Sequence, residues 1–479
     1  MVPNRNCPYC GASNQISGYK CRNCSRLIPK AIPTWAQERG KRTEMRLFGR
    51  TGLIFMTQNK WLTITICLIL SCAYFLHNYK VIPNPITLAL NAPTTTLSAD
   101  TENEPGIMIG SNLERTSVVP NVTGQLKGQV IWTLEPGFLD GLSRPTIADN
   151  ILYVGHRDFR MLALDATSGD ILWEHKTRGF VNGSPSIAGD SVFVGSTDAF
   201  MRAFDRRSGG LLWKFKANGP ITSSPTIVNG FLFFGTHSNL MYALDAATGE
   251  ELWTYDVGGT GGIYSSPAFH DGVLYFTSQD GAIHSVNYRT GQTKMKYRSR
   301  ALSASHFPVI ANELVYNLSG NRILAIDAEM REIPARWQFL RTWHILYAHR
   351  WPVPAPPSQQ GFTWWYSADE DSFFSAPPAV TTDGLYIGDS MGKLLARDPI
   401  DPSKELWTFQ TAGQISATPL VLGNVVYFGT KSGIVHALDR HSGDEIWSLD
   451  LESPITLPIT YGSGKLLVRT DDGNLIAIN

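Results

Sequence analysis

Short apolar runs separated by glycine-marked turns make up most of the chain. The stretch from 223 to 258 contains four of them, SSPTIVNG, FLFFGTHSN, LMYALDAATG and EELWTYDVG. Each run is too short for a helix, is rich in β-branched and aromatic residues, and is bounded by turn residues, which predicts a β-strand. The stretch therefore predicts a small sheet of four short strands.

This four-strand unit recurs along the chain. A small residue two places before an Asp or Asn marks its third strand, at Ala163, Ala203, Ala243, Ser285, Ala325, Ala396, Ala437 and Ala477. Six of the seven intervals are 40 to 42 residues long, and the interval from Ala325 to Ala396 is 71 residues long. Four strands in each unit of this length predict the blades of a β-propeller, and eight markers predict eight blades.

A large apolar residue recurs where each outer strand is expected. The positions are Trp132, Trp173, Trp213, Trp253, Met295, a displaced Trp337, Trp407 and Trp447. Evenly repeated aromatic residues favour packing between blades over a cofactor-binding box. The last unit ends at Asn479 without an outer strand, while residues 129–134 supply one without a blade, so we expect the two to pair and close the ring.

The unit resembles the pyrroloquinoline-quinone repeat family. Its pattern AxDxxTGxxxW is matched by Ala243, Asp245, Thr248, Gly249 and Trp253, and the resemblance covers roughly residues 129–479. It implies an all-β fold, an eight-bladed β-propeller of four-stranded blades. Relatives are quinoprotein alcohol dehydrogenases or non-catalytic scaffolds, such as the propeller lipoprotein of the outer-membrane β-barrel assembly machinery. The motif residues build blades in both groups, so they do not indicate catalysis.

The sequence argues against quinone-dependent catalysis. The resemblance implies that many such enzymes use a vicinal disulfide, a Ca²⁺ site and an Asp base, yet no two cysteines are adjacent here. The residues before the proline-led inner strands are Arg144, Ser184, Ser224, Ser266, Phe307, Ala376, Thr418 and Leu457, with no carboxylate for Ca²⁺. We expect no catalytic residue and no pyrroloquinoline quinone. Arg144 and His306 are candidates for binding a partner at the channel mouth. The alternative is a membrane-tethered quinoprotein dehydrogenase.

An insertion at about residues 335–372 is the most individual part of the propeller. It contains the candidate partner-binding residues Trp343, Trp351, Trp364, Trp365 and Tyr366. Aromatic side chains on an inserted loop favour a protein interface, because they bury much area at a small entropic cost. Two alternatives stay open: these side chains fold back over their own blade, or the acidic run 369–371 binds Ca²⁺.

Four cysteines near the N-terminus predict a metal site. Cys7, Cys10, Cys21 and Cys24 form two CxxC pairs, whose four thiolates suit a tetrahedral structural Zn²⁺. The spacing resembles the short zinc-ribbon modules of prokaryotic membrane proteins. A redox or disulfide pair is the alternative.

An uncharged run, WLTITICLILSCAYFL from 61 to 76, predicts a transmembrane helix. Basic residues concentrate before it, at Arg39, Lys41, Arg42, Arg46, Arg50 and Lys60, which places the N-terminus in the cytoplasm. A buried soluble helix, a cleaved signal peptide and lipidation at Cys72 are the alternatives.

Composition adds two constraints. The chain has 41 basic and 41 acidic residues, so nothing overall favours nucleic acid as a partner. All six cysteines lie before residue 73, which suits zinc thiolates in a reducing compartment and a cysteine-free domain in an oxidising one. The stretch after Pro83 is rich in Pro, Thr, Asn and Ser and predicts a flexible linker, although Ile107–Ile109 could dock on the next domain.

These observations predict a single-pass membrane protein with an extracytoplasmic propeller that binds a protein partner as a scaffold. The predicted parts are a zinc ribbon at 1–35, a basic juxtamembrane segment at 36–60, a transmembrane helix at 61–80, a linker at 81–128 and the propeller at 129–479. The partner's identity, and whether a small molecule also binds, do not follow from the sequence.

Overall fold

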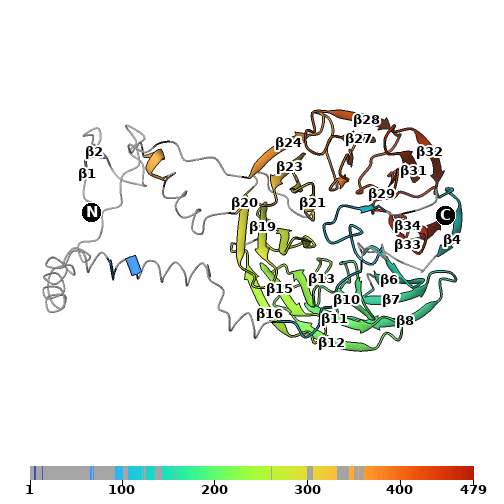
Figure 1. Ribbon diagram of the computed structural model, residues 1–479, viewed down its shortest axis with the longest axis horizontal. Helices are drawn as coiled ribbons and strands as arrows, with labels where there is room; N and C mark the ends of the chain where they lie inside the picture. The colour runs from blue at the N-terminus through green and yellow to red at the C-terminus, as the bar shows by residue number, and fades with distance from the viewer. Residues whose placement is uncertain are drawn as a thin grey trace. The chain divides into compact units, whose positions relative to one another are not determined.

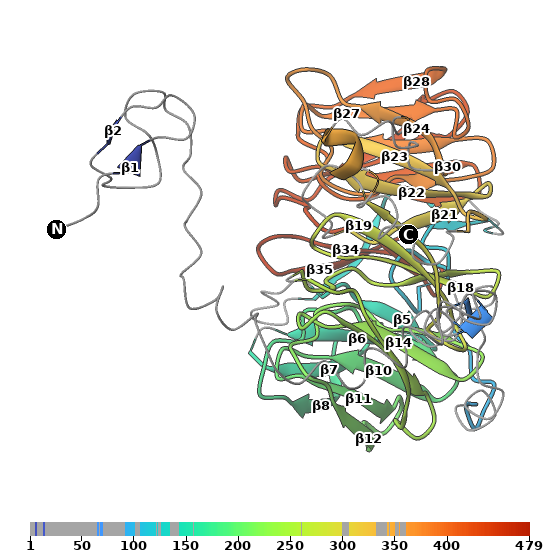
Figure 2. The same ribbon diagram turned by 90° about the vertical axis from the view of Figure 1, so that its left-hand side faces the viewer.

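Eight small sheets arranged in a ring form the C-terminal part of the chain (Figure 1). The computed structural model describes residues 5–6, 13–14, 65–66, 68–69, 92–100, 106–120, 122, 126–134, 143–156, 158–259, 261–298, 306–331, 343, 345–349, 354 and 361–479. The chain divides into two units, Met1–Asn78 and Tyr79–Asn479. The second unit is an eight-bladed propeller, which confirms the predicted all-β fold class, and Figure 2 shows the ring from its edge.

Each blade is an antiparallel sheet that runs from the channel outward. Blades 1 to 4 consist of β5 (Thr146–Ala148), β6 (Ile151–His156), β7 (Arg160–Asp165) and β8 (Ile171–Lys176); β9 (Ser186–Ala188), β10 (Ser191–Gly195), β11 (Phe200–Asp205) and β12 (Leu211–Lys216); β13 (Thr226–Val228), β14 (Phe231–Gly235), β15 (Leu240–Asp245) and β16 (Glu251–Asp256); and β17 (Ala268–His270), β18 (Val273–Thr277), β19 (Ala282–Asn287) and β20 (Thr293–Arg298).

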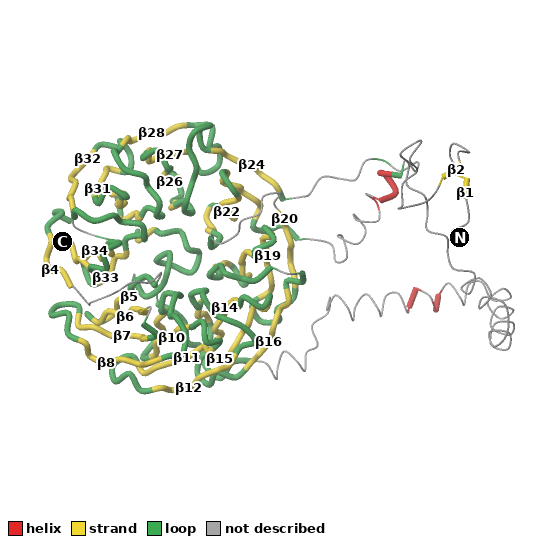
Figure 3. The backbone as a smooth tube through the Cα atoms, turned by 180° about the vertical axis from the view of Figure 1, so that it is seen from behind, coloured by secondary structure: helices red, strands yellow, loops and turns green. Residues whose placement is uncertain are grey.

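The second half of the ring repeats this order. Blades 5 to 8 consist of β21 (Val309–Ala311), β22 (Leu314–Ser319), β23 (Arg322–Asp327) and β24 (Phe362–Ser367); β25 (Ala379–Val380), β26 (Leu385–Gly388), β27 (Lys393–Arg397) and β28 (Glu405–Gln410); β29 (Leu420–Leu422), β30 (Val425–Gly429), β31 (Ile434–Asp439) and β32 (Glu445–Asp450); and β33 (Thr460–Gly462), β34 (Lys465–Arg469), β35 (Leu475–Ile478) and β4 (Val130–Leu134). Strands form the blades and loops connect them on both faces (Figure 3).

A small residue faces a large one across the two outer strands of each blade. In blade 3, Ala243 pairs with Trp253, and the register shifts directly after Ala243. The matching pairs are Ala163 with Trp173, Ala203 with Trp213, Ser285 with Met295, Ala325 with Trp364, Ala396 with Trp407, Ala437 with Trp447 and Ala477 with Trp132. The displaced Trp337 is therefore wrong for blade 5, where Trp364 holds the position. The long insertion between β23 and β24 hid this register from the sequence.

The glycine of the repeat lets the tryptophan of the preceding blade lie against the backbone. Gly249 has φ +76°, and a Cβ there would lie 2.6 Å from the Trp213 ring. The Nε1–H of Trp213 donates to the carbonyl of Ala246 in the same turn at 3.0 Å. The turn at Thr248 and Gly249 therefore both closes the hairpin of its own blade and contacts the tryptophan of the blade before it.

Both ends of the propeller close the ring. The strand β4 pairs with β35, and Trp132 lies opposite Ala477, so the N-terminal strand completes the last blade as the sequence predicted. Lys127 and Gly128 also donate backbone N–H groups to the carbonyl of Asn479, at 2.6 and 2.8 Å. The last blade thus has no open outer edge.

A stretch that the sequence placed in a flexible linker instead fills the centre of the ring. We call residues 106–119 the channel segment; Figure 1 shows it in blue inside the ring. Its carbonyls at Gly106, Ile107, Leu113, Glu114, Thr116 and Ser117 accept the N–H groups of Ile147, Ile187, Phe269, Ile310, Val380 and Val421, one from each of six blades. Its last residues form β3 (Val118–Val119), which pairs in parallel with β29. The tether prediction is wrong here, whereas docking of Ile107–Ile109 is confirmed.

The first unit has few described residues. The strands β1 (Arg5–Asn6) and β2 (Ser13–Asn14) pair antiparallel and flank Cys7 and Cys10 in the sequence, but all four cysteines lie outside the described residues. The zinc site therefore stays a prediction. Residues 65–66 and 68–69 are helical, and the described part of the chain includes no helix long and apolar enough to span a membrane.

Two tryptophans at the same blade position differ in hydrogen bonding, which gives a matched test of the contact between blades. The Nε1–H of Trp253 donates to the carbonyl of Tyr288 at 2.9 Å, whereas the buried Nε1 of Trp364 has no partner. Replacing Trp253 by Phe should cost about 1–2 kcal/mol more than replacing Trp364 by Phe, because only the first change orphans a carbonyl. Urea unfolding of W253F and W364F measures this difference. Equal losses would show that the indole contributes through its size alone.

Candidate functional site

One residue from each blade lies at the start of the inner strand and lines the channel. The strand register gives this ring as Arg144, Ser184, Ser224, Ser266, Phe307, Pro377, Thr418 and Pro458. The predicted Ala376 and Leu457 are each one residue too early. Blade 6 carries two consecutive prolines, and blade 8 has Ile459 where other blades have the proline, so the proline was an unreliable marker in both. The corrected ring still contains no carboxylate.

The serines of this ring join neighbouring blades. The backbone N–H of Arg144 donates to the Ser184 hydroxyl at 3.1 Å, that of Ser184 to Ser224 at 2.9 Å, and that of Ser224 to Ser266 at 2.9 Å. All three hydroxyls are buried. They are therefore engaged in holding blades 1 to 4 together.

The channel does not fit the groups that a quinoprotein dehydrogenase would need. The channel segment leaves a cavity of about 20 Å³ beside Arg144, which is roughly the space of one water molecule and far too small for a tricyclic quinone. The described residues include no group of three His, Cys, Asp or Glu side chains that could hold a metal ion. Asp369, from the acidic run considered for Ca²⁺, forms an ion pair with Lys393 at 2.7 Å.

Arg144 and His306, the candidate partner-binding residues at the channel mouth, lie near enough for the charge of Arg144 to act on His306. The Arg144 guanidinium lies 5.8 Å from the centre of the Phe307 ring. Burial lowers the pKa of Arg144 to about 9. Burial, and secondarily the charge of Arg144, lower the pKa of His306, so its imidazole is neutral at pH 7. The pair offers one cation and no general base with a raised pKa.

The predicted aromatic residues of the insertion do not form one cluster. Trp364, Trp365 and Tyr366 belong to the outer strand β24, where Trp364 packs on Tyr316 with ring centroids 5.8 Å apart. Trp365 is 49% exposed and stacks with Arg322. Trp343 donates its Nε1–H to the carbonyl of Pro354 at 2.8 Å. Trp351 lies outside the described residues. Trp364 thus occupies the repeat position of its blade, which the alternative of folding back on the blade anticipated.

The structure reveals an aromatic pair that the sequence analysis did not single out. Phe159, in the turn between β6 and β7, is 42% exposed, and Phe180, in the loop between β8 and β9, is 41% exposed. Their ring centroids are 5.0 Å apart. Together they form an apolar surface on one face of the propeller, which we call the Phe159–Phe180 surface.

Phe159 has a backbone conformation that a large side chain seldom adopts. Its φ is +68°, in the left-handed region. The corresponding turns carry smaller residues, namely Ala199, Asn239, Gly281, Gly320, Gly392, Gly433 and Gly473. A non-glycine residue in this region costs roughly 1 kcal/mol or more. A partly exposed phenylalanine at positive φ departs from the rest of the repeat, which makes this position a candidate for binding.

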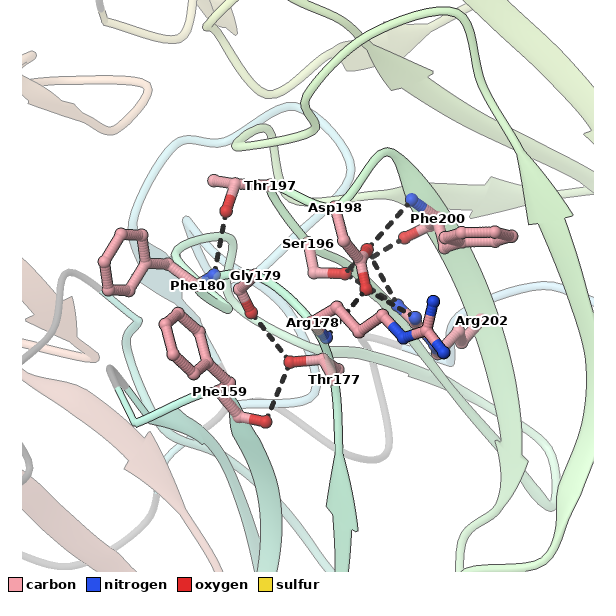
Figure 4. A network of polar contacts seen from close by, with 10 residues as sticks. All are labelled: Phe159, Thr177, Arg178, Gly179, Phe180, Ser196, Thr197, Asp198, Phe200 and Arg202. Atoms are coloured by element: carbon pink, nitrogen blue, oxygen red, sulfur yellow. Dashed lines mark hydrogen bonds and ion pairs between the residues drawn. The ribbon is translucent and has the colours of Figure 1, made fainter.

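A hydrogen-bond network fixes both phenylalanines (Figure 4). The backbone N–H and the hydroxyl of Thr177 donate to the carbonyl of Phe159 at 2.6 and 2.8 Å. The N–H of Phe180 donates to the Thr197 hydroxyl at 2.8 Å, and the N–H of Thr197 donates to the carbonyl of Phe180 at 2.9 Å. The pair is thus held in place before any partner binds.

A buried ion pair supports this network from the next blade. Asp198 accepts from the guanidinium of Arg202 at 2.6 Å and from the backbone N–H of Arg178 at 3.0 Å, and it also binds the Ser196 hydroxyl. The side chains of Asp198 and Arg202 are only 7% and 8% exposed. Burial raises the pKa of Asp198, but the hydrogen bonds from Arg202, Ser196 and Arg178 outweigh it and lower the pKa from 3.8 to about 2.

A shallow groove of about 310 Å³ lies beside Phe159 and is lined by Asp158, Arg160, Glu174, Lys176 and Thr177. Arg160 pairs with Asp158 at 2.5 Å and with Glu174 at 2.9 Å. Arg160 is paired with Asp158 and Glu174, and Arg202 with Asp198, which leaves the exposed Lys176 and Arg178 as the cations next to the two phenylalanines. The surface is therefore apolar at its centre with a small excess of positive charge beside it.

Asp198 gives a prediction about pH. Because its folded pKa lies below its unfolded value, its contribution is complete above about pH 4 and is lost as the pH falls towards 2. Replacing Asp198 by Asn should cost about 2 kcal/mol at pH 7, and the gap to the parent protein should narrow between pH 5 and pH 2. Urea unfolding across this range measures the gap, with Asp190→Asn, an 84% exposed carboxylate, as control. A gap that is constant with pH would contradict the assignment.

Comparison with known proteins agrees with this fold. A family model described as "Outer membrane protein assembly factor BamB" matches residues 116–228, 199–401 and 335–479. The chain is 30% identical over 102 residues to "Outer membrane protein assembly factor BamB" of Nitrosomonas eutropha, covering 21% of this chain and 24% of that protein. It is 26% identical over 165 residues to "Quinohemoprotein alcohol dehydrogenase ADH-IIG" of Pseudomonas putida, covering 31% of this chain and 22% of that one. The matches thus span about a quarter of these relatives' length.

Solved structures show the same architecture. The crystal structure of BamB from Moraxella catarrhalis superposes with a TM-score of 0.56 at 15% identity, covering 73% of this chain and 99% of that one. Quinohemoprotein alcohol dehydrogenase from Comamonas testosteroni superposes with a TM-score of 0.61 at 14% identity, covering 85% and 83%. At such identities the likeness concerns the fold alone. Since the family matches together run from residue 116 to the end of the propeller, the chain belongs to the family of outer membrane protein assembly factor BamB.

Proposed function

We propose that this chain is a non-catalytic scaffold that binds an acidic segment of a protein partner through the Phe159–Phe180 surface. The observation that carries the proposal is the exposed phenylalanine held at positive φ and packed against a second exposed phenylalanine, with the rings tilted by 38°. Aromatic anchors that are rigid before binding contribute most at protein interfaces, because little side-chain entropy remains to be lost. The exposed cations Lys176 and Arg178 beside the pair favour a partner that presents carboxylates around an apolar side chain.

The filled channel supports a scaffold over an oxidoreductase. Quinoprotein dehydrogenases are the alternative because some relatives carry that description. A quinone enzyme needs room for the cofactor and a base beside the substrate carbon, and the channel segment occupies that room with backbone that is hydrogen-bonded to the inner strands. Removing it would leave those N–H groups without partners.

We also propose, from residues 1–80, a cytoplasmic zinc ribbon on Cys7, Cys10, Cys21 and Cys24 and a single transmembrane helix that tethers the propeller outside the cytoplasmic membrane. Zinc analysis of the full chain and reporter fusions on either side of residues 61–80 are the direct tests. The scaffold proposal does not depend on their outcome, because the Phe159–Phe180 surface lies entirely within the propeller.

The surface can be tested with a matched pair of variants. Phe373 occupies the loop position that corresponds to Phe180, is 51% exposed and lies on a different blade. We expect F159S/F180S to lose at least about tenfold in affinity for a synthetic peptide of glutamates around a tryptophan, while F373S binds as the parent does, because only the first variant removes the anchors. Fluorescence anisotropy with the full chain measures both.

The same variants should also differ in recovery of partners from native membranes, with F373S again the control. The fold should persist in F159S/F180S, because both side chains are partly exposed and neither belongs to a strand. Equal peptide binding by all three proteins would contradict the proposal. Binding to anionic phospholipid vesicles but not to the peptide would identify the surface as a membrane contact and overturn the protein-partner assignment.

A second prediction separates the two functional classes. The full chain supplied with pyrroloquinoline quinone and Ca²⁺ should show no dye-linked oxidation of alcohols and no saturable quinone binding, because the channel has no space for the ring system. Steady-state kinetics and fluorescence titration measure these properties. Quinone-dependent turnover would establish the dehydrogenase instead.

A further inference from the structure

Two arginines approach each other in the channel without a carboxylate between them. Arg115 of the channel segment is fully buried, and its guanidinium donates to the carbonyls of Pro267 and Ile109 and to the Thr226 hydroxyl, all neutral acceptors. Arg144 has only the Phe307 ring against its guanidinium among the described residues. Burial first, and then the charge of Arg144, lower the pKa of Arg115 to about 9, so both groups stay charged at pH 7.

A buried cation such as Arg115 is costly unless an anion compensates it, and the partly exposed Arg144 adds a second positive charge nearby. The cavity beside Arg144 is the place where an anion could lie. It is bounded by the channel segment at Met108–Ser111 and Ser117 and by the inner ends of blades 1, 2, 7 and 8. Its volume of about 20 Å³ admits one water-sized particle.

Two hydroxyls that line the cavity have no hydrogen-bond partner. Thr146 and Thr418 are 1% and 3% exposed, and the Oγ1 atom of each is unpaired. Buried hydroxyls almost always find a partner, so each of these calls for one that is missing from the protein.

The reason for the Thr418 orphan lies in the repeat. The hydroxyl that corresponds to Thr418 accepts the N–H of the preceding blade, as Ser224 does from Ser184. Blade 6 presents Pro377 there, which has no N–H to give. The counterparts of Thr146 in blades 2 and 3, Ser186 and Thr226, donate to the carbonyls of Pro225 and Pro267 at 2.7 Å each, whereas the Thr146 hydroxyl makes no such bond to the next blade.

We propose that this cavity is an anion-binding site, in which Arg144 and the hydroxyls of Thr146 and Thr418 hold one chloride ion. A hydroxyl donates to an anion as readily as to water, but only an anion also compensates the arginines. Bound there, the anion would link the channel segment to blades 1 and 7 and strengthen the closure of the ring.

The test is ³⁵Cl NMR line broadening with the full chain in chloride buffer, because exchange with a protein site broadens the chloride signal. We expect excess broadening that Arg144→Gln abolishes and that Arg207→Gln, which removes a 71% exposed arginine outside the cavity, leaves unchanged. Thr418→Val, which deletes a hydroxyl without a protein partner and keeps its shape, should fold normally and bind chloride roughly tenfold more weakly.

Acetate titration tests the size of the site. Broadening that acetate leaves unchanged supports a halide site in the small cavity, and displacement of chloride by acetate would place the broadening at a more open surface and overturn the assignment. Thr418→Asp should place a carboxylate of the protein in the cavity, where it would take the place of the bound anion. It should therefore abolish the broadening and raise the urea midpoint of unfolding in chloride-free buffer. Identical broadening in the parent, R144Q and T418V proteins would overturn the proposal and leave a water molecule as the occupant.

Discussion

The inner edge of the ring sets the constraint on which the rest of the propeller depends. Every inner strand turns an unpaired edge towards the channel, and a buried N–H group without an acceptor is costly. The channel segment supplies carbonyls to six blades, and in blade 3 the N–H of Ala99 donates to the carbonyl of Ile227 at 3.2 Å. The segment that gives the inner-strand N–H groups their acceptors therefore also occupies the space through which a ligand would enter the channel. A fold that in other proteins surrounds a ligand is closed in this chain by its own polypeptide.

Contacts between blades rest on a second, local constraint. The small residue at each repeat position leaves space for the large side chain opposite it, as Ala243 does for Trp253, and the glycine of the following blade lets a tryptophan ring lie on its turn, as Gly249 does for Trp213. The tyrosine of the same blade often binds the same carbonyl, as Tyr153 and Trp173 both do with Arg206. The sizes of the small residue, the large residue opposite it and the turn glycine thus fix how neighbouring sheets pack. This explains why the repeat motif varies little at those three positions and much at the others.

The sequence predicted what the repeat encodes and missed what lies outside it. Blade number, the Ala243–Trp253 pairing and the closing strand at Trp132 follow from spacing, which is a local property. Trp364 was misplaced because the insertion separates it from Ala325, and strand register cannot be counted across a segment of unknown path. The channel segment was missed because its residues bind through backbone carbonyls, which leave no side-chain pattern. Phe159 could have been found by aligning the turns, since it stands where other units have glycine, alanine or asparagine.

The departures from the repeat mark the positions where this propeller can do more than fold. At Phe159, a large residue replaces a small one at positive φ, although its side chain stays 42% exposed. At Pro377, a missing N–H releases the Thr418 hydroxyl into a cavity beside two cations. In each case the other blades show which residue the repeat normally has at that position. The departure leaves a group, an exposed aromatic ring or an unpaired hydroxyl, that the blade itself does not use. Recognition of an acidic partner at one and of an anion at the other are the uses that match those capacities.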